Sequence, residues 1–284
     1  MTTTRQRTAL VTGAGRGLGR DIAALLADRG YQVTVTDLDA ETAAAAAAEI
    51  GRGATSAVVD VRDHAQVEQA RDTLVAESGG IDVWVNNAGV LLTGSAWDQS
   101  AEQRKLHLDV NTLGTINGSV AAIDAMRGVS PGSRGGGGHI INIASLAGIS
   151  AVPGEAVYAA SKHAVMGFSS STTADLRLAG VTDIDISCIC PDGIWTPMLY
   201  DKLEDPRAAL SFSGVLLQPS DVVRAVGKVL DKPRPVTAIP AWRGAISRLG
   251  AAFPRLGAAA MPLMEKQGRR AQRKLLRSNG PTRR

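Results

Sequence analysis

Residues 8–20 read TALVTGAGRGLGR, and this stretch decides the fold. Its first five residues form a short β-prone run, and glycines follow it in the spacing TGxxxGxG at Gly13, Gly17 and Gly19. Glycines in such a turn let the backbone approach a pyrophosphate, whose charge then meets the amides and the dipole of the helix N-terminus. The stretch therefore indicates a nucleotide-binding strand-turn-helix unit, although glycines in a tight turn can also serve packing alone.

From this unit to residue 240, short β-rich runs alternate with longer helical patterns, which is the signature of βαβ units and a parallel sheet. We expect strands at 8–12, 31–37, 55–60, 81–87, 139–145, 183–190 and 235–240, and helices at 18–29, 40–50, 64–78, 101–127, 155–179 and 219–231. Right-handed crossovers put the helices on both faces of the sheet. The sequence thus predicts one α/β domain over residues 1–240, a Rossmann-type doubly wound sheet of seven parallel strands in three α/β/α layers. The long connection at 197–218 is expected to be a substrate lid.

Composition excludes several classes of protein. Hydrophobic residues make up 44% and charged residues 20%, as in globular proteins. No run approaches the roughly 18 apolar residues of a membrane span, and no signal peptide is evident, so a cytoplasmic protein is expected. The four histidines lack metal-ligand spacing, and Cys188 and Cys190 share one face of a strand, where they are expected to pack as buried thiols. We predict no metal site.

The C-terminal extension, residues 241–284, differs in charge from the rest of the chain. Its net charge is +10, against −6 for the preceding residues. Ile246, Leu249, Phe253 and Leu256 have helical spacing, so a basic amphipathic helical extension is predicted, broken by prolines at 254 and 262. Three interpretations stay open: peripheral contact with an anionic membrane, a cover over the substrate mouth or a neighbouring subunit, or a solvated end. Nucleic acid is not expected, because no element here would read it.

Asp37 ends the second expected strand, eighteen residues after Gly19. A carboxylate there can accept hydrogen bonds from both hydroxyls of an adenosine ribose and repels a 2′-phosphate. Its alternative role is to cap the helix at 40–50, although Asp39 can cap as well. Arg16 argues the other way, because a base beside the glycines can pair with a 2′-phosphate. Asp37 weighs more, and the sequence predicts NAD over NADP.

Tyr158 and Lys162 stand four residues apart in YAASK, on one helical face. A phenol has a pKa of about 10, and a neighbouring ammonium is expected to lower the pKa of Tyr158. Such a pair makes a proton donor and acceptor. Ser145 ends the preceding strand thirteen residues earlier, and from a strand's carboxyl end it can share a crevice with Tyr158.

Together these motifs resemble the short-chain dehydrogenase/reductase family. The matching residues are TGAGRGLG at 12–19, Asp60-Val61, NNAG at 86–89, Asn111, Ser145, YAASK at 158–162, and Pro191 with Thr196. They span most of residues 8–200 in the family's order and spacing. The resemblance implies seven parallel strands flanked by helices, a nicotinamide cofactor, and a homotetramer or homodimer.

The resemblance also implies roles for these residues. Tyr158 would exchange a proton with the substrate oxygen, Lys162 would bind the nicotinamide ribose, Ser145 would hydrogen-bond the substrate, and Asn111 would hold a water that links Lys162 to solvent. The implied cofactor contacts are Gly13, Arg16, Gly17, Leu18 and Gly19 around the pyrophosphate, Asp37 with Leu38 at the ribose, Asp60 and Val61 at the adenine, Asn87, Ala88 and Gly89 under the cofactor, Ile194 and Thr196 at the carboxamide with Pro191 and Gly193 beside them, and Tyr158 and Lys162.

Asp192 departs from the family pattern, which usually has glycine directly after this proline. Its carboxylate is expected either to turn toward backbone amides at the start of the lid or the substrate mouth, or to be a solvated turn acid. Val152, Val157 and Trp195 are expected near the site, and with the apolar lid they favour an apolar substrate.

The sequence therefore predicts an NAD-dependent oxidoreductase that interconverts a small apolar secondary alcohol and its ketone, with Tyr158 as the general acid/base. One alternative is an NADP-dependent 3-oxoacyl reductase of lipid metabolism, which Arg16 favours. Another is a catalytically silent dinucleotide-binding scaffold, which the complete set of Asn111, Ser145, Tyr158 and Lys162 argues against.

Overall fold

The computed structural model describes residues 6–130, 132–133 and 135–277. Its strands are β1 (Thr8–Thr12), β2 (Gln32–Asp37), β3 (Thr55–Val58), β4 (Val83–Asn86), β5 (Gly138–Ile143), β6 (Ile184–Pro191) and β7 (Val236–Ile239). Its α-helices are α1 (Gly17–Asp28), α2 (Ala40–Ile50), α3 (His64–Ser78), α4 (Ala101–His107), α5 (Gly114–Met126), α6 (Ala156–Leu178), α7 (Pro197–Tyr200), α8 (Pro219–Asp231), α9 (Ala241–Ala252) and α10 (Pro254–Arg277). Short 3₁₀ segments, η2 (Leu146–Gly148) and η3 (Pro206–Phe212), and a π-helical segment, η1 (Leu108–Leu113), complete the elements.

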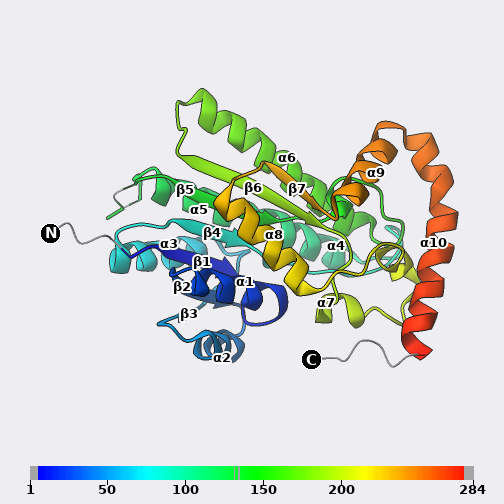
Figure 1. The fold of residues 1–284 in the computed structure, drawn as a ribbon, viewed down its shortest axis with the longest axis horizontal. Helices are drawn as coiled ribbons and strands as arrows, with labels where there is room; N and C mark the ends of the chain where they lie inside the picture. Colours follow the sequence, from blue (N-terminus) through cyan, green and yellow to red (C-terminus); the bar gives the residue numbers. More distant parts are fainter. Residues whose placement is uncertain (1–5, 131, 134, 278–284) are drawn as a thin grey trace.

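The seven strands form one sheet in the order β3-β2-β1-β4-β5-β6-β7, and every neighbouring pair is parallel. The strand order reverses between β1 and β4, which is where ligands bind in doubly wound sheets. Helices cover both faces (Figure 1), which confirms the predicted Rossmann-type fold. One large cluster of buried apolar residues lies under α1, α2 and α8, and another lies under α3, α5 and α6.

Burial explains why the central strands read as apolar runs. All five residues of β1 are buried, as expected for a parallel strand covered on both faces. On α1, Leu18, Ile22 and Leu26 recur at helical spacing and are buried against the sheet. Cys188 and Cys190 on β6 are free and buried in one cluster, which confirms their predicted packing role.

The predicted helix at 101–127 is three consecutive elements, because the π-helical segment η1 separates α4 from α5. Single π-helical turns within α-helices frequently occur at functional sites. Asn111 lies in η1 and is fully buried. The sequence pattern alone could not reveal this insertion, since the apolar spacing continues through it.

The extension is helical, as predicted, but the break predicted at Pro262 is wrong. Pro254 begins α10, where a missing amide costs no helical hydrogen bond, whereas Pro262 lies inside the continuous helix. The first part of α10 packs against α9, where Gly257 lies beside Gly250, and α10 also packs against η3, which belongs to the predicted lid at 197–218. A Cβ added at Gly268 would lie 1.8 Å from the Ala209 carbonyl oxygen, so only glycine permits this close approach. In the part of the chain that the structure describes, no helix is both long and apolar enough to cross a membrane.

Candidate active site

A cavity of about 1200 Å³ opens at the carboxyl ends of the strands. Its wall contains every predicted cofactor residue: Gly13, Arg16, Gly17, Leu18, Gly19, Asp37, Leu38, Asp60, Val61, Asn87, Ala88, Gly89, Tyr158, Lys162, Pro191, Gly193, Ile194 and Thr196. Ligand pockets usually enclose roughly 300–1000 Å³. The cavity is therefore large enough for a dinucleotide and a second ligand beside it.

The glycine turn is packed so closely that its shape is fixed. A Cβ at Gly19 would lie 2.3 Å from the Gly13 carbonyl oxygen, and one at Gly13 would lie 2.7 Å from the Ala88 Cα. The Asn87 side chain ties the turn to the end of β4, because its Nδ2 donates to the carbonyl oxygens of Thr12 at 3.1 Å and Gly13 at 2.9 Å. A Cβ added at Gly17 would have no heavy atom within 4 Å. The turn thus presents the start of α1 to the cavity without side-chain obstruction, and it fits a dinucleotide pyrophosphate.

Asp37 faces the cavity and does not cap α2. Its Oδ2 accepts a hydrogen bond from the Gly15 amide at 2.9 Å, and its Oδ1 accepts from the Asp39 amide at 3.3 Å. The N-cap of α2 is Asp39, whose Oδ1 accepts from the Thr42 amide at 2.9 Å. The capping alternative for Asp37 is therefore wrong, and its negative charge is held beside the glycine turn by backbone amides.

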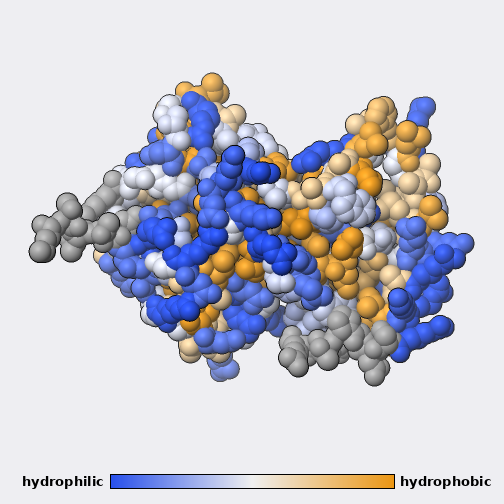
Figure 2. Space-filling view, viewed as in Figure 1, coloured by the Kyte–Doolittle hydropathy of each residue, from blue (hydrophilic) through white to orange (hydrophobic). Residues whose placement is uncertain are grey.

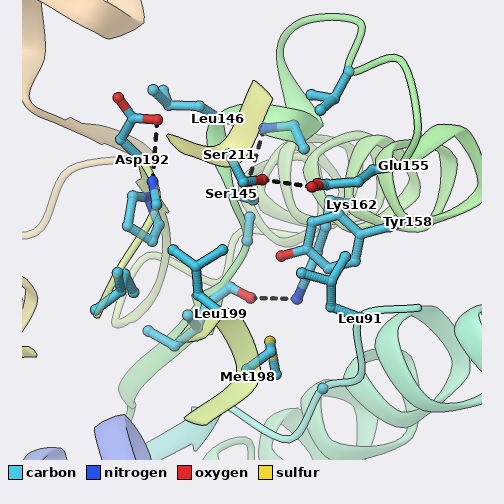
Figure 3. A pocket seen from close by; sticks show the side chains of 18 of the residues that line it. Leu91, Ser145, Leu146, Glu155, Tyr158, Lys162, Asp192, Met198, Leu199 and Ser211 are labelled. Carbon is cyan, nitrogen blue, oxygen red and sulfur yellow. Dashed lines mark hydrogen bonds between the residues drawn. The ribbon is translucent and has the colours of Figure 1, made fainter. Parts of the chain in front are cut away.

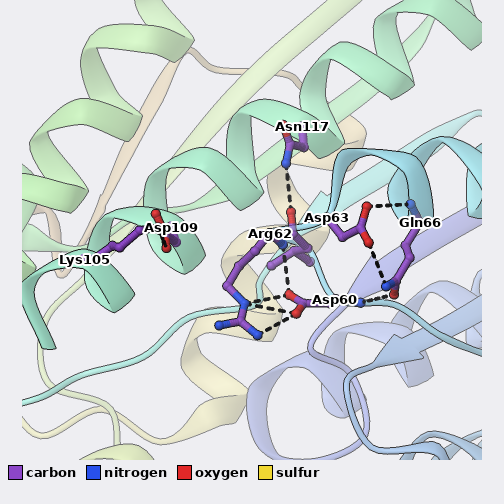
Figure 4. Close-up of polar contacts among 8 residues, drawn as sticks. Asp60, Arg62, Asp63, Gln66, Lys105, Asp109 and Asn117 are labelled. Atoms are coloured by element: carbon purple, nitrogen blue, oxygen red, sulfur yellow. Dashed lines mark hydrogen bonds and ion pairs between the residues drawn. The ribbon is translucent and has the colours of Figure 1, made fainter. Parts of the chain in front are cut away.

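The segment that follows β3 is held from several sides (Figure 4). Arg62 Nε donates to Asp60 Oδ1 at 2.9 Å, and Arg62 Nη2 donates to Asp60 Oδ2 at 2.6 Å. This hydrogen bonding lowers the pKa of Asp60. The Asn117 side chain donates to the Val61 carbonyl oxygen at 2.9 Å, and the Gln66 side chain accepts from the Asp60 amide at 2.9 Å. Asp60 and Val61 thus form a fixed edge of the cavity.

Ser145, Tyr158 and Lys162 share the inner end of the cavity (Figure 3). Ser145 follows β5, and its Oγ accepts from the Ala147 amide at 3.1 Å. Tyr158 and Lys162 lie on α6, one turn apart. The Lys162 ammonium donates to the Ile143 carbonyl oxygen at 2.9 Å and lies 5.8 Å from the centre of the Tyr158 ring. Burial lowers the pKa of Lys162 to about 8.

The expected low pKa of Tyr158 is wrong for the protein by itself. Burial raises the pKa of Tyr158 because it disfavours the phenolate, and the neighbouring Glu155 carboxylate raises it further. A hydrogen bond with Ser145 acts in the opposite direction without reversing the shift. Tyr158 is therefore a neutral phenol at physiological pH, placed to donate a proton.

Asn111 does not line the cavity but fixes two segments that do. Its Oδ1 accepts from the Val90 amide at 2.8 Å, and its Nδ2 donates to the Val90 carbonyl oxygen and to Ser161 Oγ, both at 3.0 Å. Ser161 lies beside Lys162 on α6, so Asn111 joins the residue directly after NNAG to the helix that carries Tyr158. Its implied role in holding a water stays a prediction.

The sequence is similar to those of known proteins. A family profile described as short chain dehydrogenase matches residues 7–207. The chain belongs to this family. Cyclopentanol dehydrogenase from Comamonas sp. is 34% identical over 225 residues, covering 76% of this chain and 86% of that protein.

Solved structures of the short-chain dehydrogenase family agree in fold. One from Burkholderia phymatum in complex with NAD has a TM-score of 0.78 at 26% identity, covering 90% of this chain and 97% of that one. A gluconate 5-dehydrogenase from Burkholderia cenocepacia in complex with NADP and tartrate has a TM-score of 0.72 at 28% identity, covering 83% and 94%. The family is thus an oxidoreductase family with a nicotinamide dinucleotide as cofactor.

The cavity also contains a carboxyl group that the sequence motifs did not indicate. Glu155 is 1% exposed, lines the cavity and is the residue directly before α6, three positions ahead of Tyr158. Its Oε1 accepts a 2.6 Å hydrogen bond from Ser211 Oγ of the lid. Burial raises the pKa of Glu155 to about 7. The spacing to Tyr158 was the available signal, but only the fold brings Ser211 to it.

Asp192 is neither solvated nor free. Its side chain is 7% exposed, its Oδ1 accepts from the Gly193 amide at 3.0 Å, and its Oδ2 accepts from Arg243 Nε at 2.9 Å. The carboxylate thus meets one backbone amide, that of Gly193 just before the predicted lid, and Asp192 also lines the cavity, whereas the solvated-turn alternative is wrong. The sequence did not indicate the partner on α9, because 51 residues separate the two side chains.

Two residues expected near the substrate lie elsewhere. Trp195 is 8% exposed and packs with Leu199, Leu203 and Phe212 beneath the lid, so it supports the lid and does not line the cavity. Val157 is also absent from the described cavity wall, whereas Val152 belongs to it. Position on α6 explains the difference for Val157, which precedes Tyr158 directly and so points to another side of the helix.

Proposed function

We propose that this oxidoreductase interconverts an apolar secondary alcohol and its ketone with NAD as the hydride carrier. One observation carries the proposal: the same cavity has a glycine-lined wall and an apolar wall. Ser145, Tyr158 and Lys162 lie where these walls meet, a place that we call the junction. Hydride transfer belongs to the bound nicotinamide, and the protein supplies position and proton balance.

In ketone reduction, the neutral Tyr158 donates its proton to the substrate oxygen while a hydride reaches the carbonyl carbon. Ser145 hydrogen-bonds the same oxygen and orients it. In alcohol oxidation the proton moves from the alcohol to the Tyr158 phenolate as the hydride leaves the carbon. Burial of Tyr158 opposes this phenolate. The Lys162 ammonium, which exists mainly below the lysine pKa of about 8, would offset part of that cost.

The cofactor choice rests on Asp37. Its carboxylate is fixed at the adenosine end by the Gly15 amide, where a 2′-phosphate would add a second negative charge. Arg16 lies in the same wall and favours the second candidate, an NADP-dependent 3-oxoacyl reductase. Measuring kcat/KM with NADH and NADPH on a cyclic ketone and on a 3-oxoacyl thioester separates the two.

The substrate class rests on the wall opposite the glycines. Leu91, Leu146, Val152, Met198 and Leu199 supply its apolar surface. The Arg243 guanidinium in this wall is already paired with Asp192, so it is not available to clamp a substrate carboxylate. The name of the cyclopentanol dehydrogenase relative is consistent with a cyclic apolar alcohol.

A screen of cyclic and open-chain secondary alcohols with NAD, followed by nicotinamide absorbance, tests the proposal. We expect turnover with apolar alcohols, and its loss in Tyr158→Phe. Absence of turnover in both directions across the screen, with dinucleotide still bound, would instead favour the silent scaffold.

A further inference from the structure

The two helices of the extension present large apolar side chains to solvent. We name this set the apolar hairpin face; it consists of Trp242, Ile246, Leu249, Phe253, Leu256 and Leu263, which are 52–71% exposed. Trp242, Ile246 and Leu249 follow at steps of four and three residues along one side of α9, and Phe253 comes directly after this helix. Leu256 and Leu263 are seven apart along one side of α10. Contiguous exposed apolar surface of this kind marks an interaction site.

The apolar hairpin face is continuous with the mouth of the active-site cavity. Ile246, Leu249, Phe253 and Leu256 belong to both, and Met261 extends the cavity wall along α10. Figure 2 shows hydrophobic surface over α9 and the adjoining part of α10, and hydrophilic surface over the rest of α10. Whatever covers the hairpin therefore also covers the route into the cavity.

The rest of α10 is strongly cationic. Its exposed basic residues are Lys266, Arg269, Arg270, Arg273, Lys274 and Arg277. Of the ion pairs formed by described residues, one involves this group, between Arg269 and Glu265.

One line along α10 joins the apolar and the cationic surface. Leu256, Leu263, Arg270 and Arg277 are spaced seven residues apart, and the opposite side of the helix is occupied because Gly268 and Gln272 pack on the lid. A flat surface lying along this 24-residue helix therefore contacts leucines over its N-terminal half and arginines over its C-terminal half.

We propose that α9 and α10 dock on an anionic lipid membrane, so that the cavity opens toward the bilayer and takes a lipid-dissolved substrate. Apolar side chains that enter the lipid interface, combined with lysine and arginine near anionic headgroups, are the two attractions that hold amphipathic helices on membranes. A second copy of the chain fits less well, because it would bring the same strongly basic helix, whose one acidic residue, Glu265, is already paired with Arg269. The docking stands on the surface alone, whereas the substrate route rests on the proposed function.

Vesicle flotation of the full-length protein tests the docking. We expect binding to vesicles of phosphatidylcholine with phosphatidylglycerol, and little binding to phosphatidylcholine alone. Arg273→Glu/Lys274→Glu should weaken binding by about tenfold or more, since each basic residue near the surface contributes about fivefold. Arg224→Glu/Lys228→Glu, the same charge change on exposed positions of α8, should leave binding unchanged.

The apolar contribution is tested by Leu249→Glu/Leu256→Glu, which should reduce binding by about tenfold or more. The matched control is Val129→Glu/Leu178→Glu, whose native side chains are 63% and 88% exposed but lie outside the extension. Equal partition of all four variants and the native protein would overturn the proposal. So would a native dimer that Leu249→Glu/Leu256→Glu converts to monomer while no form binds vesicles, because a second copy would then cover the face.

The substrate route has its own measurement. Arg273→Glu/Lys274→Glu should lower turnover of a long-chain secondary alcohol dissolved in anionic vesicles by about tenfold, in proportion to lost binding, and leave turnover of cyclopentanol in solution unchanged. Equal effects on both alcohols would contradict membrane delivery. Since flotation needs no turnover, failure of the alcohol chemistry and failure of docking are separately visible.

Discussion

The two ends of the active-site cavity are built in different ways. At the nucleotide end, backbone amides and glycines set the geometry, and neighbours in the chain hold the charged side chains, as Arg62 holds Asp60. At the substrate end, the wall comes from the lid and the extension, held by Glu155 with Ser211 and Asp192 with Arg243, pairs that lie 56 and 51 residues apart. The first end can be recognised in the sequence because it contains local motifs, the glycine turn and Asp60 with Arg62, although Asn87 and Asn117 also hold it from distant parts of the chain. The second end has no such local motif, and its pairs are particular to this chain.

This difference makes three predictions. Substitutions where the two ends meet should change turnover of every substrate. Substitutions at the substrate end should change the stability of the contacts that hold the lid, and substitutions at the nucleotide end should change the preference between NAD and NADP. The following variants test the comparison in order of expected effect.

Tyr158→Phe removes the proton donor at the junction. We expect kcat to fall by about 10²–10⁴ on every substrate, because general acid/base catalysis contributes about that much. Dinucleotide affinity should hold within about twofold, since the hydroxyl is not expected to carry cofactor binding. Stopped-flow turnover and fluorescence titration measure the two quantities, and a loss confined to one substrate would contradict a shared proton donor.

Glu155→Gln should flatten the dependence of stability on pH. Glu155 has a pKa of about 7 in the folded protein against 4.5 as the ordinary value. Between these values the folded state keeps the proton that the unfolded state loses, so the free energy of unfolding falls as pH rises, by up to about 1.4 kcal/mol per unit. Urea unfolding between about pH 5 and 7 measures this slope.

In Glu155→Gln the slope should lose this contribution, while Glu41→Gln on the exposed start of α2 should retain it. Identical slopes in Glu155→Gln and the native protein would show that the buried carboxyl is ionised throughout, and that the lid contact does not depend on its proton.

Asp192→Asn should lower the free energy of unfolding by about 1–3 kcal/mol, because Arg243 is left partly buried without its partner. Arg243→Gln should cost a similar amount, and the double variant no more than either alone. Asp231→Asn is the matched control, since its pair with Arg29 is exposed and contributes about 0–1 kcal/mol. If the two losses in free energy of unfolding add up in the double variant, Asp192 and Arg243 stabilise the protein independently and not through their ion pair.

Asp37→Asn should narrow the preference for NAD over NADP by about tenfold in kcat/KM, since the repelling charge is removed at one site. Asp39→Asn removes a neighbouring charge that caps α2 and should leave the preference unchanged. If the native enzyme prefers NADP, Arg16 and not Asp37 determines which cofactor is bound.

The sequence by itself determined the seven-stranded doubly wound sheet, because strand and helix patterns and the glycine turn are local features that parallel connections can assemble in few ways. The residues that it predicts to contact the cofactor all lie in the cavity wall, since the carboxyl ends of the strands meet at one edge of the sheet.

Only the tertiary structure decided the rest. Whether Tyr158 is acidic depends on burial and on Glu155, and burial is not a property of the YAASK motif. Whether Asp192 is a turn acid or an ion-pair partner depends on Arg243, which reaches it only when α9 packs against β7. Trp195 packs under the lid because apolar side chains there bury its large apolar surface. Electrostatics and packing act through space, and so the chemistry of the site depended on which distant segments the fold brought together.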